Sequence, residues 1–496
     1  MGVNHPVLLA PVHRLQRNEL EPWAGLIAQR LEAGDRIITL FGRPDTSGGA
    51  VTTAVVERSG GAMAVLRGHA ASPASFPSLT PRFPAVQMFE RELWEQTGIV
   101  PGGHPWLKPV RYEGARQQHM NEHPFFSVRG PEIHEVGVGP IHAGVIEPGH
   151  FRFMCHGEQV HHLELQLGYQ HRGVEAQLLT RPAHSLTPLI ESIVGDSSVA
   201  YAWGYCAAVD ALTDFPTSPE ADVVAGIALE MERAAMHLAT LAGLMADIAF
   251  LQGSATYGRL RTAIINATMR ICGSRFGRGW LRPGGPRFGL TDDLRHDLKT
   301  TLAAFSADLA GVNDLVVSAR TVRTRLRGVG IVGRQAAVDL GLVGVAARAS
   351  GVAVDARVSQ PGVLYSAHPI ATSTEADGDC WARTLLRMRE VVESVRWITS
   401  VLDEPNLDLR GTSRRARGTT STLQPDTVCV SVREGVRGPV VQVLETGSDG
   451  RLLHYKVQDP SLVNWFGLAL AVRNNDISDF PICNKSFDLS YCGNDL

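Results

Sequence analysis

The first hundred residues carry a mixed pattern of helix and strand. Trp23–Glu32 and Gln87–Glu95 are predicted as helices with apolar residues available for burial, and Gly98 is placed to end the second one. Shorter apolar or alternating runs, two of them separated by a Ser-Gly-Gly turn, predict strands at Asp35–Phe41, Val51–Glu57 and Ala62–Leu66. The pattern indicates a small α/β domain over residues 1–115.

A polar stretch at residues 116–130, which we interpret as a linker, separates this domain from a second region at residues 131–496. That region opens with two predicted strands, Phe151–Cys155 and Gln159–Leu167, joined by a tight turn at His156-Gly157-Glu158. The pattern becomes helical from Gly173 onward.

Three long helices are predicted in this second region. The first is expected to begin at the Ser218-Pro219 cap and run to Phe250, the second to begin at Thr291, and the third to cover Asp379–Leu402. Strands are expected at Val428–Val432 and Val440–Leu444, followed by an irregular tail. The fold class is therefore α+β, with a small α/β N-terminal domain joined to a mainly α-helical domain that has a small β part.

Composition narrows the class of protein. The chain has 496 residues, 44% hydrophobic and 20% charged, with a net charge of -3 and no stretch that interleaves basic and aromatic residues. Nucleic acid is therefore not an expected partner. No apolar run reaches the roughly 20 residues that span a bilayer, so we expect no transmembrane helix. Met1–Arg17 lacks a small-residue cleavage site, which favours a cytoplasmic location over secretion.

The seven cysteines are spread along the chain without a C-x-x-C pair. This spacing argues against a disulfide framework and against a zinc or iron-sulfur site held by this chain alone. We expect most of these cysteines to be small buried side chains.

One glycine motif, Gly328-Val-Gly330-Ile-Val-Gly333, fits the G-x-G-x-x-G pattern of a dinucleotide site. That site needs a strand before the glycines, whereas Arg320–Arg327 is predicted as the end of a basic helix. We interpret the motif as a structural turn. NAD binding by a nicotinamide dehydrogenase is left as a distant alternative.

Seven of the 18 histidines lie between His134 and His171. His161 and His162 would point to opposite faces of a strand, so hydrogen-bonded histidines are favoured over a metal site. His142 differs, because it lies in a glycine-flanked loop that would present one imidazole. Asp247 interrupts an apolar helical stretch, which predicts either a solvent-facing or capping role, or a pairing with another group.

An ordered set of motifs resembles a known superfamily. Phe89–Gly98 and Gly103–Pro109 resemble the C-type peripheral subunit of NADH:quinone oxidoreductase, or complex I. A fusion of C-like and D-like parts is similar to the large subunit of formate hydrogenlyase and hydrogenase-4 type complexes, which are energy-converting [NiFe]-hydrogenases. The motifs that resemble the D-type, hydrogenase-like subunit are Gly139–His142, Glu147–Phe153, Gly168–Glu175, Glu230–Arg233 with His237, Arg275-Phe276 with Arg282–Gly285, Arg348–Gly351, Gly378–Arg383 and Glu434–Gly438.

The resemblance implies four cysteine positions that would hold nickel and iron. Val194 and Ser197 occupy the first pair of positions, and Ser490 and Gly493 occupy the second. These residues cannot supply the thiolates that such a centre needs, and Cys492 is one position out of register. No NiFe centre and no other metal or cofactor held by this chain is therefore expected.

In the complex I branch, the cavity without metal binds a quinone head group. The resemblance assigns His142 and Asp247 to the histidine and aspartate of that site, with Glu175 as a proton-relaying glutamate whose pKa a dry site would raise. The tyrosine that holds quinone in that branch aligns near Gly195, which leaves Tyr201 and Tyr205 either to substitute for it or, as is favoured, simply to pack. The predicted catalytic residues are His142, Asp247 and Glu175, in a quinone cavity that includes Gly195 and Tyr201.

The expected function is that of a redox subunit in a membrane-associated complex that passes electrons to a quinone or another small acceptor, coupled to ion translocation. The resemblance implies an iron-sulfur small subunit as partner, which would hold the iron-sulfur clusters, together with antiporter-like subunits of a membrane arm. The chain itself would be cytoplasmic and peripheral on the inner face of the membrane. An active [NiFe]-hydrogenase and a non-catalytic assembly scaffold are the alternatives.

Overall fold

A computed structural model describes residues 6–45, 48–71, 74–113, 123–144, 146–215, 217–411 and 422–496. The predicted linker at residues 116–130 lies partly outside these residues. The fold combines helices and sheets in separate layers, which confirms the predicted α+β class.

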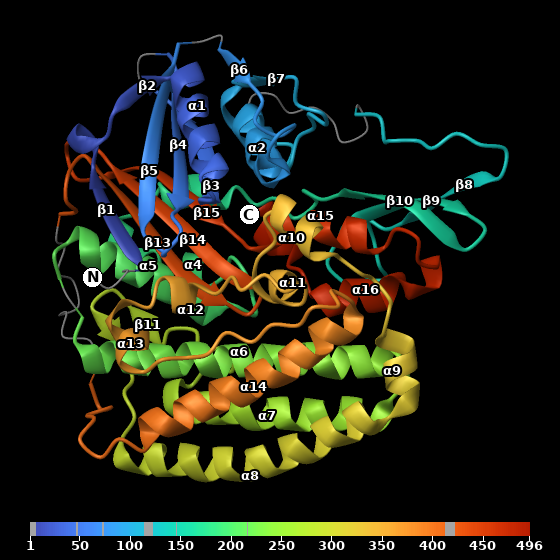
Figure 1. The fold of residues 1–496 in the computed structure, drawn as a ribbon. Coiled ribbons are helices and arrows are strands. Elements are labelled where there is room, and N and C mark those ends of the chain that lie inside the picture. Colours follow the sequence, from blue (N-terminus) through green and yellow to red (C-terminus); the bar gives the residue numbers. More distant parts are fainter. Residues whose placement is uncertain are drawn as a thin grey trace.

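The N-terminal region contains a four-stranded sheet in the order β2-β5-β4-β3, covered on one face by α1 (Leu20–Glu32) and α2 (Gln87–Thr97) (Figure 1). Trp23 and Leu93 are buried between these helices and the sheet. Gly98 ends α2 with a φ of 76°, as predicted. The sheet strands are β2 (Arg17–Glu19), β3 (Arg36–Pro44), β4 (Ala50–Glu57) and β5 (Met63–Ala70), and the short strands β6 (Ser75–Pro77) and β7 (Val100–Gly102) pair beside them.

A second four-stranded sheet joins the two ends of the chain. Its order is β1-β13-β14-β15, built from β1 (Val7–Pro11), β13 (Thr427–Gly435), β14 (Gly438–Thr446) and β15 (Leu452–Gln458). Phe41 of β3 and Val430 of β13 belong to one buried cluster, so the two sheets pack together. The prediction placed residues 1–115 in one unit, whereas β1 pairs with β13 in the other sheet.

Four long helices lie side by side in the opposite layer (Figure 1). Ser218 caps the first through a hydrogen bond from the Ala221 N–H at 3.2 Å, as predicted, and Thr291 and Asp379 cap two others. The helices are α6 (Pro219–Asp247), α7 (Leu251–Cys272), α8 (Asp292–Ser318) and α14 (Cys380–Leu402).

Within the described residues, no single helix is long and apolar enough to cross a membrane. Helices α8 and α9 (Arg320–Leu326) would be long and apolar enough only if they formed one continuous helix, but they are bent by 71° at the break between them.

A three-stranded antiparallel sheet projects from the side of the molecule, with β8 (Ile133–Val138), β9 (His150–His156) and β10 (Gln159–Gln166) in the order β10-β9-β8 (Figure 1). His161 and His162 lie on β10 as predicted, and His162 Nδ1 lies 3.2 Å from Arg473 Nη2. Short elements connect the layers: β11 (Leu281–Arg282), β12 (Gly285–Pro286), α3 (Val174–Leu178), α4 (Thr187–Ile190), α5 (Ser198–Leu212), α10 (Arg334–Asp339), α11 (Gly344–Arg348), α12 (Ala356–Ser359) and α13 (Gly362–Ala367), with 3-10 turns at Val12–Arg14, Pro84–Val86, Ala183–Ser185 and Ile477–Asp479.

The C-terminal tail is helical, so the prediction of an irregular tail was wrong. It forms α15 (Ser461–Ala471), α16 (Phe480–Phe487) and α17 (Tyr491–Asp495). Helix α15 is apolar and buried on nearly all sides, with Trp465 3% exposed. A helix of this kind has no polar face, so the periodicity that marks a surface helix is missing.

The glycine motif at residues 328–333 follows helix α9 rather than a strand, which confirms the interpretation as a structural turn. The Gly328 N–H donates to Asp379 Oδ2 at 2.7 Å, and Gly330 has a φ of 67°. The amide that a dinucleotide fingerprint would aim at a pyrophosphate is thus used to hold the start of α14.

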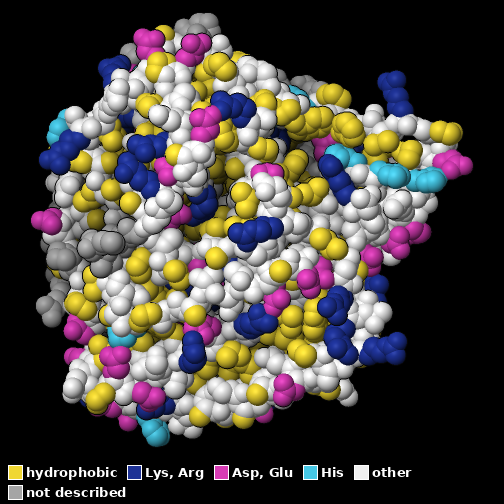
Figure 2. Space-filling view, viewed as in Figure 1, with side chains coloured by type: hydrophobic (Ala, Val, Ile, Leu, Met, Phe, Trp, Pro, Cys, Tyr) yellow, Lys and Arg dark blue, Asp and Glu magenta, His cyan; other side chains and the backbone are white. Residues whose placement is uncertain are grey.

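On the surface, hydrophobic side chains gather in a hollowed region between α2 and the projecting β9–β10 hairpin (Figure 2).

Candidate functional site

The two segments that resemble metal-binding motifs lie next to each other, although almost 300 residues separate them. Arg172 joins them, because its Nη2 donates to the carbonyl oxygens of Ile193 at 2.9 Å and Cys492 at 3.1 Å. The fold therefore brings together the four predicted positions Val194, Ser197, Ser490 and Gly493.

Each of these positions serves the protein's own structure. Val194 is 1% exposed in the main core, Ser197 precedes α5, and Ser490 caps α17 by accepting the Gly493 N–H at 2.9 Å. The set offers an alkyl group, two hydroxyls and a residue without a side chain. It does not supply the four soft thiolates that a nickel-iron centre requires.

Asp459 fills the space beside Gly493. A Cβ atom at position 493 would lie 2.6 Å from Asp459 Cγ and Oδ2, closer than such atoms approach. The same Oδ2 accepts a hydrogen bond from the Tyr201 hydroxyl at 2.6 Å, and Oδ1 accepts the Ser461 N–H at 2.7 Å. A fourth cysteine could therefore not be added here without moving a carboxylate that is held on both sides.

Tyr201 is completely buried, and burial together with Asp459 raises its pKa well above the usual value. Its hydroxyl is therefore a neutral hydrogen-bond donor at every working pH. Tyr201 therefore contacts the carboxylate of Asp459, which lies beside Gly493.

Arg437 supplies positive charge between the two segments. Its Nη1 and Nη2 each donate to the Asp196 carboxylate at 2.8 Å, and Nη2 lies 3.5 Å from Asp488 Oδ2. Burial would raise the pKa of Asp488, but Lys485 and Arg437 hold it well below its usual range. Fixed charges therefore lie between the two segments.

His142 lies in the loop between β8 and β9, half-buried. Its Nε2 lies 2.9 Å from the Gly149 carbonyl oxygen, which can only accept, so Nε2 carries a proton and Nδ1 is left for another partner. The ring packs on Phe151, with 5.8 Å between centroids, and Phe151 in turn contacts Tyr491 at 6.3 Å. One aromatic side chain therefore separates His142 from the segment of Ser490 and Gly493.

Asp247 is the last residue of α6 and is exposed. Desolvation raises its pKa, and the charge of Lys485 acts against this shift. The described contacts include none between Asp247 and His142, so the structure does not bring this predicted pair together. The aspartates that do lie in the site are Asp196, Asp459 and Asp488.

Glu175 lies in the first turn of α3 and is tied to its surroundings. Its Oε1 accepts the Val457 N–H at 2.9 Å and lies 3.0 Å from Lys456 Nζ, while Oε2 accepts from Gln96 Nε2 at 3.1 Å. Burial alone would raise its pKa, but Lys456 and Arg111 lower it. The expected raised pKa was therefore wrong, because the sequence did not reveal the buried lysine.

Gly195 is exposed at the start of the first segment, and the nearest side-chain atom to a Cβ placed there would be Arg278 Nη2 at 3.8 Å. A larger side chain would fit. Nothing from the described part of the chain takes the place of the tyrosine that the resemblance expects at this position.

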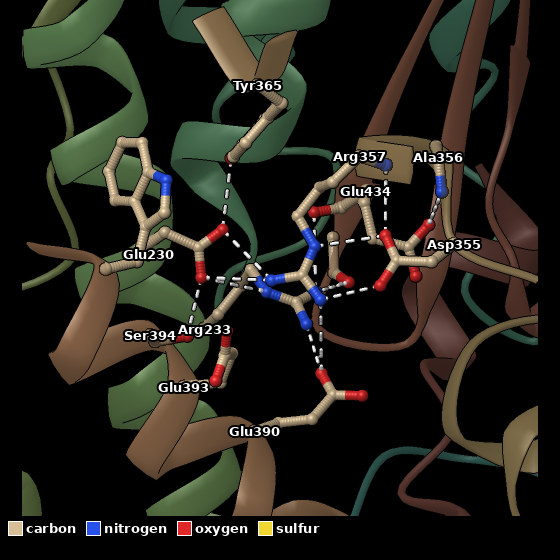
Figure 3. Close-up of polar contacts among 12 residues, drawn as sticks. Glu230, Arg233, Asp355, Ala356, Arg357, Tyr365, Glu390, Glu393, Ser394 and Glu434 are labelled. Atoms are coloured by element: carbon tan, nitrogen blue, oxygen red, sulfur yellow. Dashed lines mark hydrogen bonds and ion pairs between the residues drawn. The ribbon is translucent and has the colours of Figure 1, made fainter. Parts of the chain in front are cut away.

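Several motif residues serve a buried ion network instead of the site (Figure 3). Arg357 Nη1 lies 3.1 Å from Glu230 Oε1 and its Nη2 lies 2.6 Å from Asp355 Oδ2. Desolvation would raise the pKa of Glu390, but Arg348 and Arg233 hold it well below its usual value. The network joins α6, α14 and β13 and so fixes the scaffold around the site.

No group of three or more histidine, cysteine or acidic side chains that could hold a metal occurs in the part of the chain that the structure describes.

Sequence comparisons match both halves of the chain. Residues 54–125 match the 30 Kd subunit and residues 247–410 the 49 Kd subunit of respiratory-chain NADH dehydrogenase. Hydrogenase-4 component G of Escherichia coli is 26% identical over 437 residues, which cover 84% of this chain and 75% of the relative. The chain belongs to the complex I and energy-converting hydrogenase superfamily.

Other members of this superfamily are similar to this chain at comparable levels of sequence identity. Formate hydrogenlyase subunit 5 of Escherichia coli is 27% identical over 85% of this chain and 77% of the relative. The D-type subunit of NADH-quinone oxidoreductase from Campylobacter concisus is 30% identical over 48% of this chain and 59% of the relative. The predicted superfamily is confirmed, and the chain is an oxidoreductase subunit that acts within a complex.

Sequence reasoning missed the charged residues that define the site. Arg437 lies within the Glu434–Gly438 motif, and Asp488 lies two residues before Ser490, in the second segment that resembles a metal-binding motif. Both could have been selected by their position. Asp459 carries no such signal, because only the turn between β15 and α15 brings it to Gly493.

Proposed function

We propose that this chain is the redox subunit of a membrane-associated hydrogenase-like complex that passes electrons to a quinone or another small acceptor without a nickel-iron centre. The carboxylate of Asp459 beside Gly493 carries the proposal, because it takes the space of a fourth cysteine. It is supported by the lack of a thiolate at all four positions.

His142 is the residue that we propose to face the acceptor. With Nε2 bound to the Gly149 carbonyl, the protonated ring can donate from Nδ1 to an acceptor oxygen as negative charge develops on it. Reduction of a quinone to a quinol takes two electrons and two protons, of which one would pass from His142 and the other from solvent water. Asp247 stays a candidate for the same site by resemblance, whereas Glu175 is suited to hold Lys456 rather than to release a proton.

The electrons would come from iron-sulfur clusters in a partner small subunit, and antiporter-like subunits would couple the reaction to ion translocation. Formate hydrogenlyase subunit 5 and hydrogenase-4 component G, by their names, are parts of larger assemblies. We propose the same arrangement here, with this chain cytoplasmic on the inner face of the membrane.

The test uses the complex purified with its partners. We expect no stoichiometric nickel by metal analysis, no hydrogen evolution, and quinone reductase activity whose kcat falls by about 10²–10⁴ in His142→Ala. His134→Ala is the matched control, because His134 is an exposed histidine on neighbouring strand β8. Stoichiometric nickel or hydrogen evolution would refute the proposal in favour of an active hydrogenase. Full activity of an intact His142→Ala complex would favour an assembly scaffold.

A further inference from the structure

A cavity of about 490 Å³ lies between the N-terminal region and the rest of the chain, under the apolar hollow of Figure 2. Its walls are α2 with the segment that follows it, strand β10, and helix α15. A volume of this size with a mostly apolar lining is typical of a small-molecule site. The larger apolar side chains that line it include Met88, Trp106, Leu165, Trp465 and Phe466.

Two of the basic side chains in this lining are fully engaged by the protein. Arg91 donates from Nε to the Lys108 carbonyl at 2.8 Å and from Nη2 to the Pro109 carbonyl at 3.0 Å. Lys108 Nζ pairs with Glu164 Oε1 at 2.6 Å and lies over the rings of Trp106 and Phe125. Glu164, the one carboxylate among the described lining residues, is therefore already paired.

Arg473, at the edge of the cavity, has no such partner. Its Nη2 bonds to His162 Nδ1 at 3.2 Å, and its buried Nε has no hydrogen-bond partner among the described residues. No described carboxylate lies within 4.0 Å of its guanidinium group, which in proteins binds carboxylates through paired hydrogen bonds. The cavity thus combines an apolar interior with a cation, Arg473, that has neither a described carboxylate partner nor a full set of hydrogen bonds.

We propose that this cavity binds a long-chain carboxylate of the fatty-acid type, with the chain among the apolar side chains and the carboxylate on Arg473. Among the residues around Gly493, the cavity lining includes Asn494 but none of the four positions that resemble metal ligands, and its ligand is neither oxidised nor reduced. Binding at the cavity and the proposed electron transfer can therefore fail independently of each other.

The test measures binding of two chain-matched probes, dodecanoate and dodecanol, to the full-length chain by calorimetry below their micellar concentrations. Dodecanoate should bind about tenfold more tightly, because only its head group can pair with the guanidinium. Arg473→Gln should remove this difference and leave the dodecanol affinity within about twofold. Ala469→Phe, which places a ring on the cavity wall formed by α15, should weaken binding of both probes.

Arg323→Gln is the matched control, since it removes an exposed guanidinium on α9, a helix that contributes no residue to the cavity lining. Met88→Trp is a second filling variant if Ala469→Phe lacks the wild-type circular dichroism spectrum. Equal affinity for the two probes, or an unchanged preference in Arg473→Gln, would overturn the proposal. Binding of the chain to phosphatidylglycerol vesicles that free dodecanoate does not displace would also overturn the proposal, in favour of a lipid surface.

Discussion

Lys456 should be one of the side chains on which stability depends most. It is fully buried in β15, with Nζ 2.5 Å from Glu92 Oε1 on α2 and 3.0 Å from Glu175 Oε1 on α3. Lys456→Met would leave two buried carboxylates without this cation, and breaking a buried ion pair costs about 3–5 kcal/mol. Glu92 keeps Arg111 and Glu175 keeps the Val457 N–H, so we expect a loss near the lower value, about 3 kcal/mol.

Urea unfolding of the full-length chain at pH 7, read as a shift of the midpoint, measures this loss. Lys299→Met is the matched control, because the Lys299–Asp403 pair is about half exposed and should contribute less than about 1 kcal/mol. Lys456→Met/Glu175→Gln should recover part of the stability by removing an unpaired charge. A single variant no less stable than the control, or a double variant no more stable than the single one, would refute the reasoning.

Two further predictions concern the candidate site and the acid limit of the fold. Gly493→Ala should lower the free energy of unfolding in urea by about 1–3 kcal/mol, because the new Cβ would meet Asp459. Gly258→Ala on α7 is the control: its Cβ would have open space, so this variant should be more stable by about 0.5–1 kcal/mol. Equal effects of the two variants would contradict the steric argument. Burial raises the pKa of Glu113, but the hydrogen bonds from His171 and Gln96 and the charge of Arg111 together outweigh burial and lower the pKa from 4.5 to about 2. A carboxyl whose pKa is lower in the folded than in the unfolded protein stabilises the fold above pH 4.5, and this contribution is lost as the pH falls towards 2. Glu113→Gln should therefore reduce the fall in the free energy of unfolding across this pH window. Glu132→Gln is the control and should not have this effect, because Glu132 forms an exposed pair with His156.

Local signals predicted helices α1, α2, α6, α8 and α14. The Ser218 cap and the left-handed Gly98 mark ends of α6 and α2 where the sequence placed them, because capping depends only on residues a few positions away. The basic helix before Gly328 likewise favoured a structural turn over a dinucleotide site, and the structure has helix α9 there. Elements whose pairing is distant were missed: nothing near Val7–Pro11 indicates that this strand pairs with β13.

The sequence by itself determined that no thiolate stands at the four positions that resemble metal ligands, since this follows from side-chain identity alone. Only the tertiary structure decided what surrounds these positions. The fold lets Asp459 close the space at Gly493, lets Arg437 join Asp196 and Asp488, and leaves Asp247 exposed without a contact to His142 among the described residues. Charge pairing and steric exclusion act over a few ångströms in space, so they depend on contacts between distant segments that no local pattern specifies.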